Sequence, residues 1–295
     1  MNALIHTQAL GKRYGRRWAL TDCDLDIPAG HVVGLVGPNG AGKTTLLNLV
    51  TGQLAPSAGH ISVLGGEPGH DAAQLARVGY VAQDSPTYAH LSVADHLRLG
   101  RHLNPGWDDE LARQRVERLG LDMQRKAGRL SGGQRAQLAL TLGVAKRPQL
   151  LALDEPVAAL DPLARREFLQ GLMEATVETE LSVLLSSHLV SDLERTCDYL
   201  VLLDQGKVRM AAPLDEVFGT HHRLTGPRTD ASRLPQDMQV ISVHHTDRQS
   251  TYVVRTGQPI HDPTWSVSDL SLEDVVLAYL TPAPSDPAPA LEVLR

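Results

Sequence analysis

The sequence predicts an α/β protein with a mixed, largely parallel sheet, an antiparallel β layer before it, a helical insertion within it and a small α+β domain after it. Three observations support this fold class. Short apolar runs at 32–36 and 150–153 have the length and composition of strands buried in a parallel sheet. Each run leads into glycine-rich or acidic residues, as expected where such strands end at a ligand crevice. The length of 295 residues is sufficient for one large and one smaller domain.

The overall composition limits the class of protein. Lys and Arg total 28 against 34 Asp and Glu, so the net charge of −6 offers no general basic surface, and no nucleic-acid partner is expected. Cys23 and Cys197 lie far apart, which suits a reducing compartment and two small buried side chains. No apolar run approaches the roughly 18 residues of a membrane span, and residues 1–10 lack the plan of a signal peptide. We expect a cytoplasmic chain, unless a partner holds it at a membrane.

The antiparallel β layer is predicted at the start of the chain. Residues 3–8 and 18–27 alternate roughly as strands do. Tyr14 lies between them, about two dozen residues before the glycine-rich segment that follows strand 32–36. Alone, it would be taken for a partly buried tyrosine. Its position favours stacking on an adenine ring, because an aromatic side chain can stack on the face of any base.

Residues 37–45 form a glycine-rich turn between strand 32–36 and a helix predicted at 43–49. The glycines let backbone N–H groups converge on one anion, and the helix N-terminus adds a partial positive charge. In this full Gly-x-x-x-x-Gly-Lys-Thr pattern, Lys43 reaches the β- and γ-phosphates of a nucleotide and the Thr44 hydroxyl binds Mg²⁺. The predicted nucleotide contacts here are Gly37, Pro38, Asn39, Gly40, Ala41, Gly42, Lys43, Thr44 and Thr45.

A helical insertion at about 86–147 separates the two halves of the core. The elements predicted before and within it are strands 61–64 and 78–82 and helices 93–99, 109–119 and 134–146. Ser131 is a suitable N-cap for the last helix, so a well-capped helix is the simplest interpretation. That interpretation leaves Gly132 and Gly133 unexplained, because each glycine costs a helix about 1 kcal/mol relative to alanine. Bare backbone at a helix N-terminus is a second place for phosphate to bind.

Two further apolar strands lead into polar residues at the sheet edge where the phosphate loop lies. Residues 150–153 directly precede Asp154 and Glu155. Residues 182–185 are followed by two serines and then by His188. We expect Asp154 to bind Mg²⁺, usually through water, and Glu155 to orient or deprotonate an attacking water. A lone histidine is more often structural than functional, but its place just past a core strand favours a role for His188.

The rest of the chain predicts the end of the core and a small appendage. A hairpin with a three-residue glycine turn is expected over 199–211, and the nucleotide-binding domain is expected to span residues 1–219. A small α+β domain, residues 220–280, would begin with a linker and contain strands 240–244 and 251–254 and a helix, 271–280, capped by Ser271. Residues 281–295 are rich in Pro and Ala and are predicted to be disordered. The paired histidines lack ligand partners at metal spacing and are interpreted as solvated: His221, His222, His244 and His245.

Together these residues resemble the nucleotide-binding subunit of an ATP-binding cassette (ABC) transporter over residues 3–219. Residues 37–45 resemble the Walker A loop, and residues 150–155 resemble Walker B with its catalytic glutamate. Leu-Ser-Gly-Gly-Gln at 130–134 matches the family signature letter for letter, and its place between the two Walker motifs makes the resemblance specific. Four further features are similar to the adenine-stacking aromatic, the Q-loop, the D-loop and the switch histidine, namely Tyr14, Gln83, residues 159–161 and His188.

The resemblance implies a P-loop NTPase core, ATP and Mg²⁺ as ligands, and ATP hydrolysis. The catalytic residues it implies are Lys43, Gln83, Glu155 and His188, and the metal-binding residues are Thr44, Gln83 and Asp154. Further nucleotide contacts are implied at Ser131, Gly132, Gly133, Gln134 and Asp161. The chain departs from the common family pattern at Arg135-Ala136 and at Val157-Ala158-Ala159, but neither departure removes a chemical group from the site.

The resemblance also implies partners. Two identical cassettes would dimerise head to tail, each ATP lying between the phosphate loop of one copy and residues 131–133 of the other. A separate integral membrane subunit would carry the transport path and hold the chain at the inner face of the cell membrane. Residues 271–275 resemble the extension of drug- and antibiotic-export ATPases more than the oligonucleotide-fold domain of sugar importers, which predicts an exporter.

Other classes of function remain as alternatives. A soluble cassette ATPase acting on nucleic acid or ribosomes would call for a second cassette, a long coiled-coil insertion or a basic face, and the sequence shows none of these. A nucleotide-binding regulator without turnover fits poorly with the presence of Glu155. A kinase would need an acceptor site, and none is evident.

Overall fold

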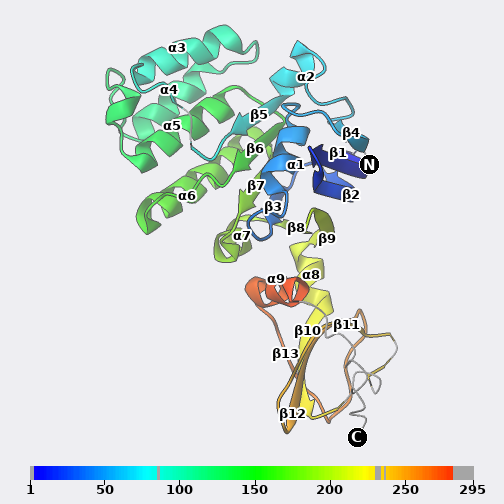
Figure 1. The fold of residues 1–295 in the computed structure, drawn as a ribbon. Coiled ribbons are helices and arrows are strands. Elements are labelled where there is room, and N and C mark those ends of the chain that lie inside the picture. Colours follow the sequence, from blue (N-terminus) through cyan, green and yellow to red (C-terminus); the bar gives the residue numbers. More distant parts are fainter. Residues whose placement is uncertain (1–2, 85–86, 230–233, 236, 282–295) are drawn as a thin grey trace, which may run out of the picture. The chain divides into compact units, whose positions relative to one another are not determined.

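The computed structural model describes residues 3–84, 87–229, 234–235 and 237–281. The chain divides into two compact units, residues 1–211 and 212–295 (Figure 1). The predicted domain boundary at 219 lies too late in the chain, because helix α8, Leu214–Thr220, packs against strand β10 of the second unit. The predicted disordered tail comprises residues 281–295, and from residue 282 onward it lies outside the part of the chain that the structure describes.

A six-stranded sheet forms the centre of the first unit, in the order β5-β6-β7-β3-β8-β9. Strand β3 pairs in parallel with both β7 and β8, and β6 pairs in parallel with both β5 and β7. All residues of β3, β6 and β7 are buried, which explains their continuous apolar character. The predicted parallel core is therefore confirmed. The strands are β3 Val32–Val36, β5 Val78–Val81, β6 Leu150–Asp154, β7 Ser182–Ser187, β8 Tyr199–Asp204 and β9 Lys207–Pro213.

The hairpin between β8 and β9 has a tighter turn than predicted. Strand β8 continues through Asp204, so Gln205 and Gly206 alone connect the two strands. Their φ angles of 49° and 75° are both positive, as a two-residue hairpin turn of the primed type requires. The prediction of a three-residue turn was wrong because Asp204 extends the ladder instead of leaving it.

The predicted antiparallel layer is present as a second sheet of the first unit, with strand order β2-β1-β4. Strands β1, Ala3–Tyr14, and β2, Arg17–Pro28, are longer than expected, and Tyr14 is paired with Arg17 at the end of their ladder. Strand β4, Ala58–Val63, pairs with the other edge of β1. Helix α1, Lys43–Val50, shares one hydrophobic core cluster with these strands. The buried leucines of this cluster include Leu10, Leu20 and Leu35 of the strands β1, β2 and β3 and Leu47 and Leu49 of the helix.

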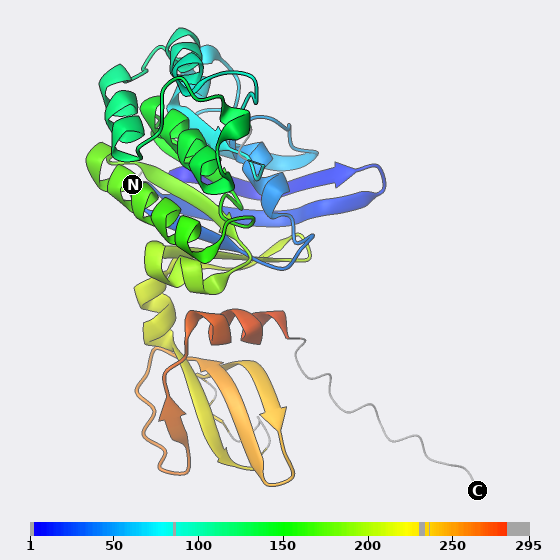
Figure 2. The ribbon, with the colours of Figure 1, turned by 90° about the vertical axis from the view of Figure 1, so that its left-hand side faces the viewer.

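Helices α3–α5 form the predicted insertion, and Figure 1 shows them grouped on one side of the first unit, with β1 and β2 on the other. Figure 2 shows the same grouping from the side. Helix α5 begins with the predicted Ser131 cap, and Gln134 completes a reciprocal capping box. The helices are α2 Ala72–Arg77, α3 Val93–Leu103, α4 Asp109–Arg118 and α5 Gly132–Ala145, with a 3₁₀ turn at Ala127–Arg129. After the insertion come α6 Pro162–Thr179 and α7 Val190–Thr196.

The second unit contains a four-stranded antiparallel sheet with the order β11-β12-β10-β13. The predicted strand pair is confirmed as β11, Gln239–His245, and β12, Gln249–Arg255, and Ser271 caps helix α9, Leu272–Leu280, as expected. The predicted linker from 220 was wrong in its first part, because residues 221–227 form β10, which pairs with β12 and with β13, Ser266–Ser268. The strand escaped prediction because only His221 and Leu224 in it are buried.

The paired histidines do not all lie in solvent. His221 is only 3% exposed, its Nδ1 lies 2.9 Å from the Val217 carbonyl oxygen and its Nε2 lies 2.9 Å from the Tyr279 hydroxyl. The interpretation as a solvated histidine was therefore wrong for this residue, because β10 turns it into the unit. His245 is exposed and its Nδ1 lies 2.8 Å from the Ser250 hydroxyl. Across the described residues, the longest helices are too short or too polar to span a membrane.

Candidate functional site

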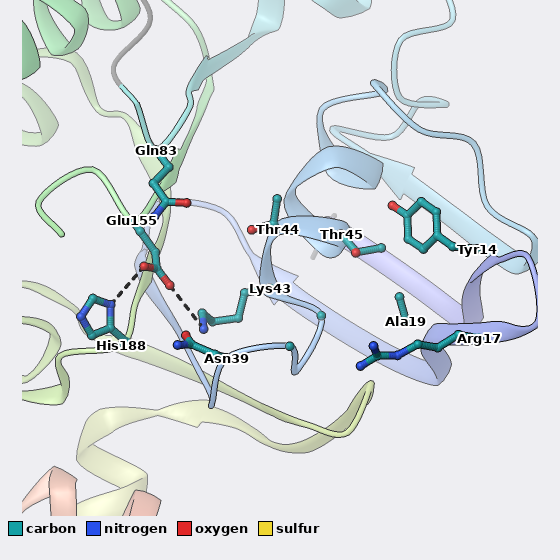
Figure 3. A pocket seen from close by; sticks show the side chains of 12 residues that line it. Tyr14, Arg17, Ala19, Asn39, Lys43, Thr44, Thr45, Gln83, Glu155 and His188 are labelled. Atoms are coloured by element: carbon teal, nitrogen blue, oxygen red, sulfur yellow. Dashed lines mark hydrogen bonds and ion pairs between the residues drawn. The ribbon is translucent and has the colours of Figure 1, made fainter. Parts of the chain in front are cut away.

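A cavity of about 680 Å³ opens in the first unit where β3, β6 and β7 end. Figure 3 shows Gln83, Glu155 and His188 at one end of it, Tyr14 and Arg17 at the other, and the phosphate-loop side chains between them. The geometry thus brings together residues that lie far apart in the sequence. The lining residues are Tyr14, Arg17, Ala19, Asn39, Gly40, Gly42, Lys43, Thr44, Thr45, Gln83, Glu155 and His188.

Lys43 places a buried cation at the floor of this cavity. Its side chain is 6% exposed, and its Nζ donates to the carbonyl oxygens of Gly37 at 2.8 Å and Pro38 at 3.3 Å. Among the residues that the structure describes, no side chain caps the N-terminus of α1, which begins after Gly42, so its first N–H groups are available to a ligand. An ammonium group beside free helix N–H donors is the donor set that a phosphate group requires.

Two glycines of the loop are required by space and by backbone conformation. Gly37 has a φ of 157°, and a Cβ there would lie 2.2 Å from the Leu203 carbonyl oxygen. Gly42, the N-cap of α1, has a φ of 109°, and a Cβ there would lie 2.6 Å from the Leu20 side chain. Any larger residue would displace the loop from the strands behind it.

Two acidic residues end strand β6 with different surroundings. Asp154 is 2% exposed, and its Oδ1 accepts a hydrogen bond of 2.8 Å from the Ser186 hydroxyl. Glu155 faces the cavity, where its Oε1 lies 3.4 Å from Lys43 Nζ and its Oε2 lies 3.0 Å from His188 Nδ1. Glu155 has a φ of 44°, in the left-handed region, so the chain leaves the extended path of β6 at this residue.

The charge of Asp154 is felt by its neighbour in the next strand. Burial, and after it the negative charge of Asp154, raises the pKa of the Tyr80 hydroxyl. Asp154 therefore adds negative potential at the end of the sheet where Lys43 supplies positive charge.

The far end of the cavity is aromatic and basic. Tyr14 is 50% exposed, and Lys12 Nζ lies 5.8 Å from the centre of its ring. A half-exposed ring on the cavity wall has the placement predicted for stacking on adenine. Arg17 and Ala19 also line the cavity and were not predicted. The signal that could have found Arg17 is its cross-strand pairing with Tyr14 across the short turn at residues 15–16.

Several predicted site residues do not line the cavity. Gly37 and Pro38 contribute carbonyl oxygens that hold Lys43, Ala41 is buried in the loop, and Asp154 lies behind the lining. The signature residues Ser131, Gly132, Gly133 and Gln134 lie at the start of α5, and Ser131 and Gly132 are exposed. Asp161 caps α6 by accepting 3.0 Å hydrogen bonds from the Leu163 and Ala164 amides.

Part of the reason for the signature glycines is local packing. A Cβ at Gly133 would lie 2.8 Å from the Ala164 Cβ, so a side chain there would push α5 away from the start of α6. Gly132 has no such restriction, since the nearest atom to a Cβ there is 3.8 Å away. Packing therefore explains one of the two glycines, and the exposed Gly132 is the one that it leaves unexplained.

The site offers oxygen ligands suited to Mg²⁺. The Thr44 hydroxyl and the Gln83 amide belong to residues that line the cavity, and the Asp154 carboxylate lies at the strand end behind it. No cluster of three or more His, Cys, Asp or Glu side chains arranged for a metal occurs among the described residues. Mg²⁺ is compatible with this set, because it keeps several water ligands and needs only one or two from protein, together with substrate phosphates.

A parallel sheet with a phosphate loop and two acids at its carboxyl edge defines a P-loop nucleotide-binding protein. Comparisons with known proteins narrow this class. The model of the ABC transporter family matches residues 20–158. A thiamine import ATP-binding protein, ThiQ of Jannaschia sp. (strain CCS1), is 38% identical over 202 residues, which are 67% of this chain and 88% of the relative. The chain therefore belongs to the ABC transporter family, among its ATP-binding proteins.

Other relatives agree with this placement. The sulfate/thiosulfate import ATP-binding protein CysA 1 of Agrobacterium fabrum (strain C58 / ATCC 33970) is 34% identical over 226 residues, covering 73% of this chain. The chain spans less than two thirds of such relatives, 65% of this one and 61% of the CysA protein of Salmonella typhi. A solved structure described as an ATP binding subunit of an ABC transporter superposes with a TM-score of 0.65 at 27% identity, covering 72% of this chain and 91% of that one.

Proposed function

We propose that this protein is a Mg²⁺-dependent ATPase that works as a pair of cassettes and powers a separate membrane subunit of an ABC transporter. The observation that carries the proposal is the placement of Glu155. Its carboxylate lies in the same cavity as the phosphate loop, within 3.4 Å of Lys43 Nζ and 3.0 Å of His188 Nδ1. A carboxylate so placed is a general base beside a phosphate site.

Each residue has a part in hydrolysis that follows from its contacts. Lys43 exchanges its contacts with the loop carbonyls and Glu155 for the phosphate oxygens of ATP, which frees one oxygen of Glu155. Glu155 then accepts a proton from the attacking water, and His188 keeps hold of the other carboxylate oxygen. Gln83, which lines the same end of the cavity as Glu155, orients the water. When bound by Thr44, Gln83 and Asp154, Mg²⁺ would neutralise charge that develops on the phosphate oxygens.

The second cassette is needed because the phosphate loop and the signature do not share a cavity within one chain. The start of α5 is exposed, and residues 131–134 are missing from the lining of the cavity. Its first N–H groups can therefore reach a phosphate only from another copy, in which Asp161 would lie at the same interface. Two helix N-termini on opposite sides of a triphosphate gather more positive potential than either face supplies alone.

The transport path is assigned to another polypeptide, so we place the chain at the inner face of the cell membrane through that partner. Relatives carry names of import proteins for sulfate or thiosulfate, molybdenum and thiamine. They give no support to the export that residues 271–275 predicted. The proposal therefore extends to ATP-driven transport and not to its direction.

Steady-state ATPase assays and sedimentation of the Glu155→Gln variant test the proposal. Glu155→Gln removes the base and keeps the shape, so we expect kcat to fall by at least about 100-fold, the lower end of the contribution of a general base. The variant should bind ATP and sediment as a dimer. In contrast, Ser131→Arg lies outside the cavity and should bind ATP but remain monomeric.

Three outcomes would overturn parts of the proposal. Wild-type turnover by Glu155→Gln would remove the general-base assignment, and a strictly monomeric ATP-loaded Glu155→Gln would remove the second cassette. Recovery of ribosomes or DNA in place of an integral membrane protein, together with their stimulation of ATP hydrolysis, would favour the soluble cassette ATPase.

A further inference from the structure

Ser186 is a buried hydroxyl that contacts both acids of the site. It is 0% exposed and lies in β7, directly opposite Asp154 of β6 in the parallel register. Its Oγ donates to Asp154 Oδ1 at 2.8 Å and accepts the backbone N–H of Glu155 at 2.8 Å. The one hydroxyl group therefore donates its hydrogen to the carboxylate of Asp154 and accepts the backbone N–H of Glu155 with a lone pair.

The first of these bonds restricts the Asp154 carboxylate. A carboxylate at the end of a strand rotates about its χ angles unless a partner holds it. The hydroxyl of Ser186 fixes Oδ1, so the direction of the whole carboxyl group is set before a metal ion arrives. Outer partners of this kind commonly control how well a ligand binds its metal.

The second bond stabilises an unfavourable backbone conformation. Glu155 has a φ of 44°, in the left-handed region that residues other than glycine rarely adopt. Its amide donates to Ser186 at this turn, and the turn brings the side chain of Glu155 to the cavity. Strain of this type persists where surrounding bonds over-determine it.

We propose that Ser186 is a positioning residue for ATP hydrolysis, which holds the metal-binding Asp154 and the general base Glu155 through a single hydroxyl. The inference rests on the proposed function, because it assigns work to those two acids. The neighbouring hydroxyl has a different role, since Ser187 accepts from the Leu189 amide at 3.0 Å and serves the following turn. Residues 183–185, which precede Ser186 in β7, are apolar and buried. A buried hydroxyl next to them would lower stability if it had no hydrogen-bond partner, so the two bonds of Ser186 also satisfy its polar group.

An isosteric pair of variants isolates the hydroxyl. Ser186→Thr and Ser186→Val add the same volume at the same site, and only threonine keeps the donor and acceptor. We expect Ser186→Val to lower kcat about tenfold relative to Ser186→Thr, the effect of about one lost hydrogen bond. Ser182→Ala is the matched control, because Ser182 is also buried in β7 but accepts from the Gly30 amide, away from the acids.

Metal binding without turnover provides the second measurement. With ADP present, Mn²⁺ binding followed by electron paramagnetic resonance should weaken about fivefold to tenfold in Ser186→Val compared with Ser186→Thr. ADP affinity in EDTA should be equal in both, because the phosphate loop does not contact Ser186 through any hydrogen bond that the structure describes.

The outcomes separate this inference from the proposed function. Equal kcat and equal Mn²⁺ affinity for the threonine and valine variants would overturn the role of Ser186. The same conclusion would follow if Ser182→Ala lost as much kcat and Mn²⁺ affinity as Ser186→Val does. A wild-type protein with no ATPase activity would overturn the proposed function, and the Mn²⁺ measurement would still test the link between Ser186 and Asp154.

Discussion

The two units of the chain use their polar side chains in opposite ways. In the first unit, polar groups that follow the core strands face a cavity, with Lys43 at its floor and Glu155 on its wall. In the second unit, buried polar groups pair with one another, as His221 does with Tyr279 and as Ser250 does with the Thr229 amide. The difference teaches that the first unit is built to hold a ligand and that the polar interior of the second unit maintains its own fold. Substitutions should therefore alter ligand binding in the first unit and stability in the second.

The largest expected effect tests the first half of this comparison. Lys43→Ala removes a buried cation from the phosphate site, and we expect ATP affinity to fall roughly tenfold to a hundredfold. This range corresponds to about 1.5–3 kcal/mol for a hydrogen bond to a charged group. The thermal midpoint without nucleotide should change little, since Glu155 lines an open cavity and Pro38 is exposed, so water can reach these two partners of Lys43. Isothermal titration and thermal unfolding measure the two quantities.

Lys146→Ala is a matched control for this prediction. Lys146 also donates to a carbonyl oxygen, that of Val78 at 2.7 Å, and burial lowers the pKa of its ammonium group. It does not line the cavity, so ATP affinity should be unchanged. An equal loss of affinity in both variants would show that burial of the lysine matters more than its place in the phosphate site.

A smaller effect is expected at the other end of the cavity. Tyr14 is half exposed, so Tyr14→Ala should cost about 1 kcal/mol, roughly fivefold in affinity, the low end of the range for stacking on a base. ATP and ADP should lose the same factor, because the ring contacts the base and not the phosphates. Tyr14→Phe keeps the ring and should bind both nucleotides as the wild type does. A loss in Tyr14→Phe would instead assign the affinity to the hydroxyl.

The same contrast between units explains how much the sequence could predict. The strands around the site are continuous apolar runs that end in polar residues, and β3, β6 and β7 were predicted closely from that pattern. Cavity residues with motif spacing, such as Lys43 and Glu155, were found for the same reason. Ser186 was missed because its partner lies on another strand, and a register such as Asp154 opposite Ser186 is a tertiary fact. Arg17 was missed because the predicted strands, 3–8 and 18–27, stopped short of the hairpin end at which it pairs with Tyr14. Strand β10 was missed because most of its residues are polar and only His221 and Leu224 in it are buried.

The smallest expected effect tests the second unit through pH. Burial lowers the pKa of His221 below its ordinary value of 6.5, while nearby Arg255 and His222 lower it further and Glu216 and the Val217 carbonyl oppose this. The unfolded chain then binds a proton at a higher pH than the folded chain. The contribution of neutral His221 to the stability of the second unit is therefore fully present above pH 6.5. It is lost as the pH falls from 6.5 toward the pKa of His221 in the folded chain. Hydrogen exchange of the β10 and β12 amides, converted to opening free energies at pH 7 and pH 5, should show this loss in the wild type. The loss should be smaller in His221→Gln, which keeps polar contacts near Tyr279 without titrating. ATP affinity should not follow the same pH dependence, and if it does, the two units are not independent in the way that their polar interiors indicate.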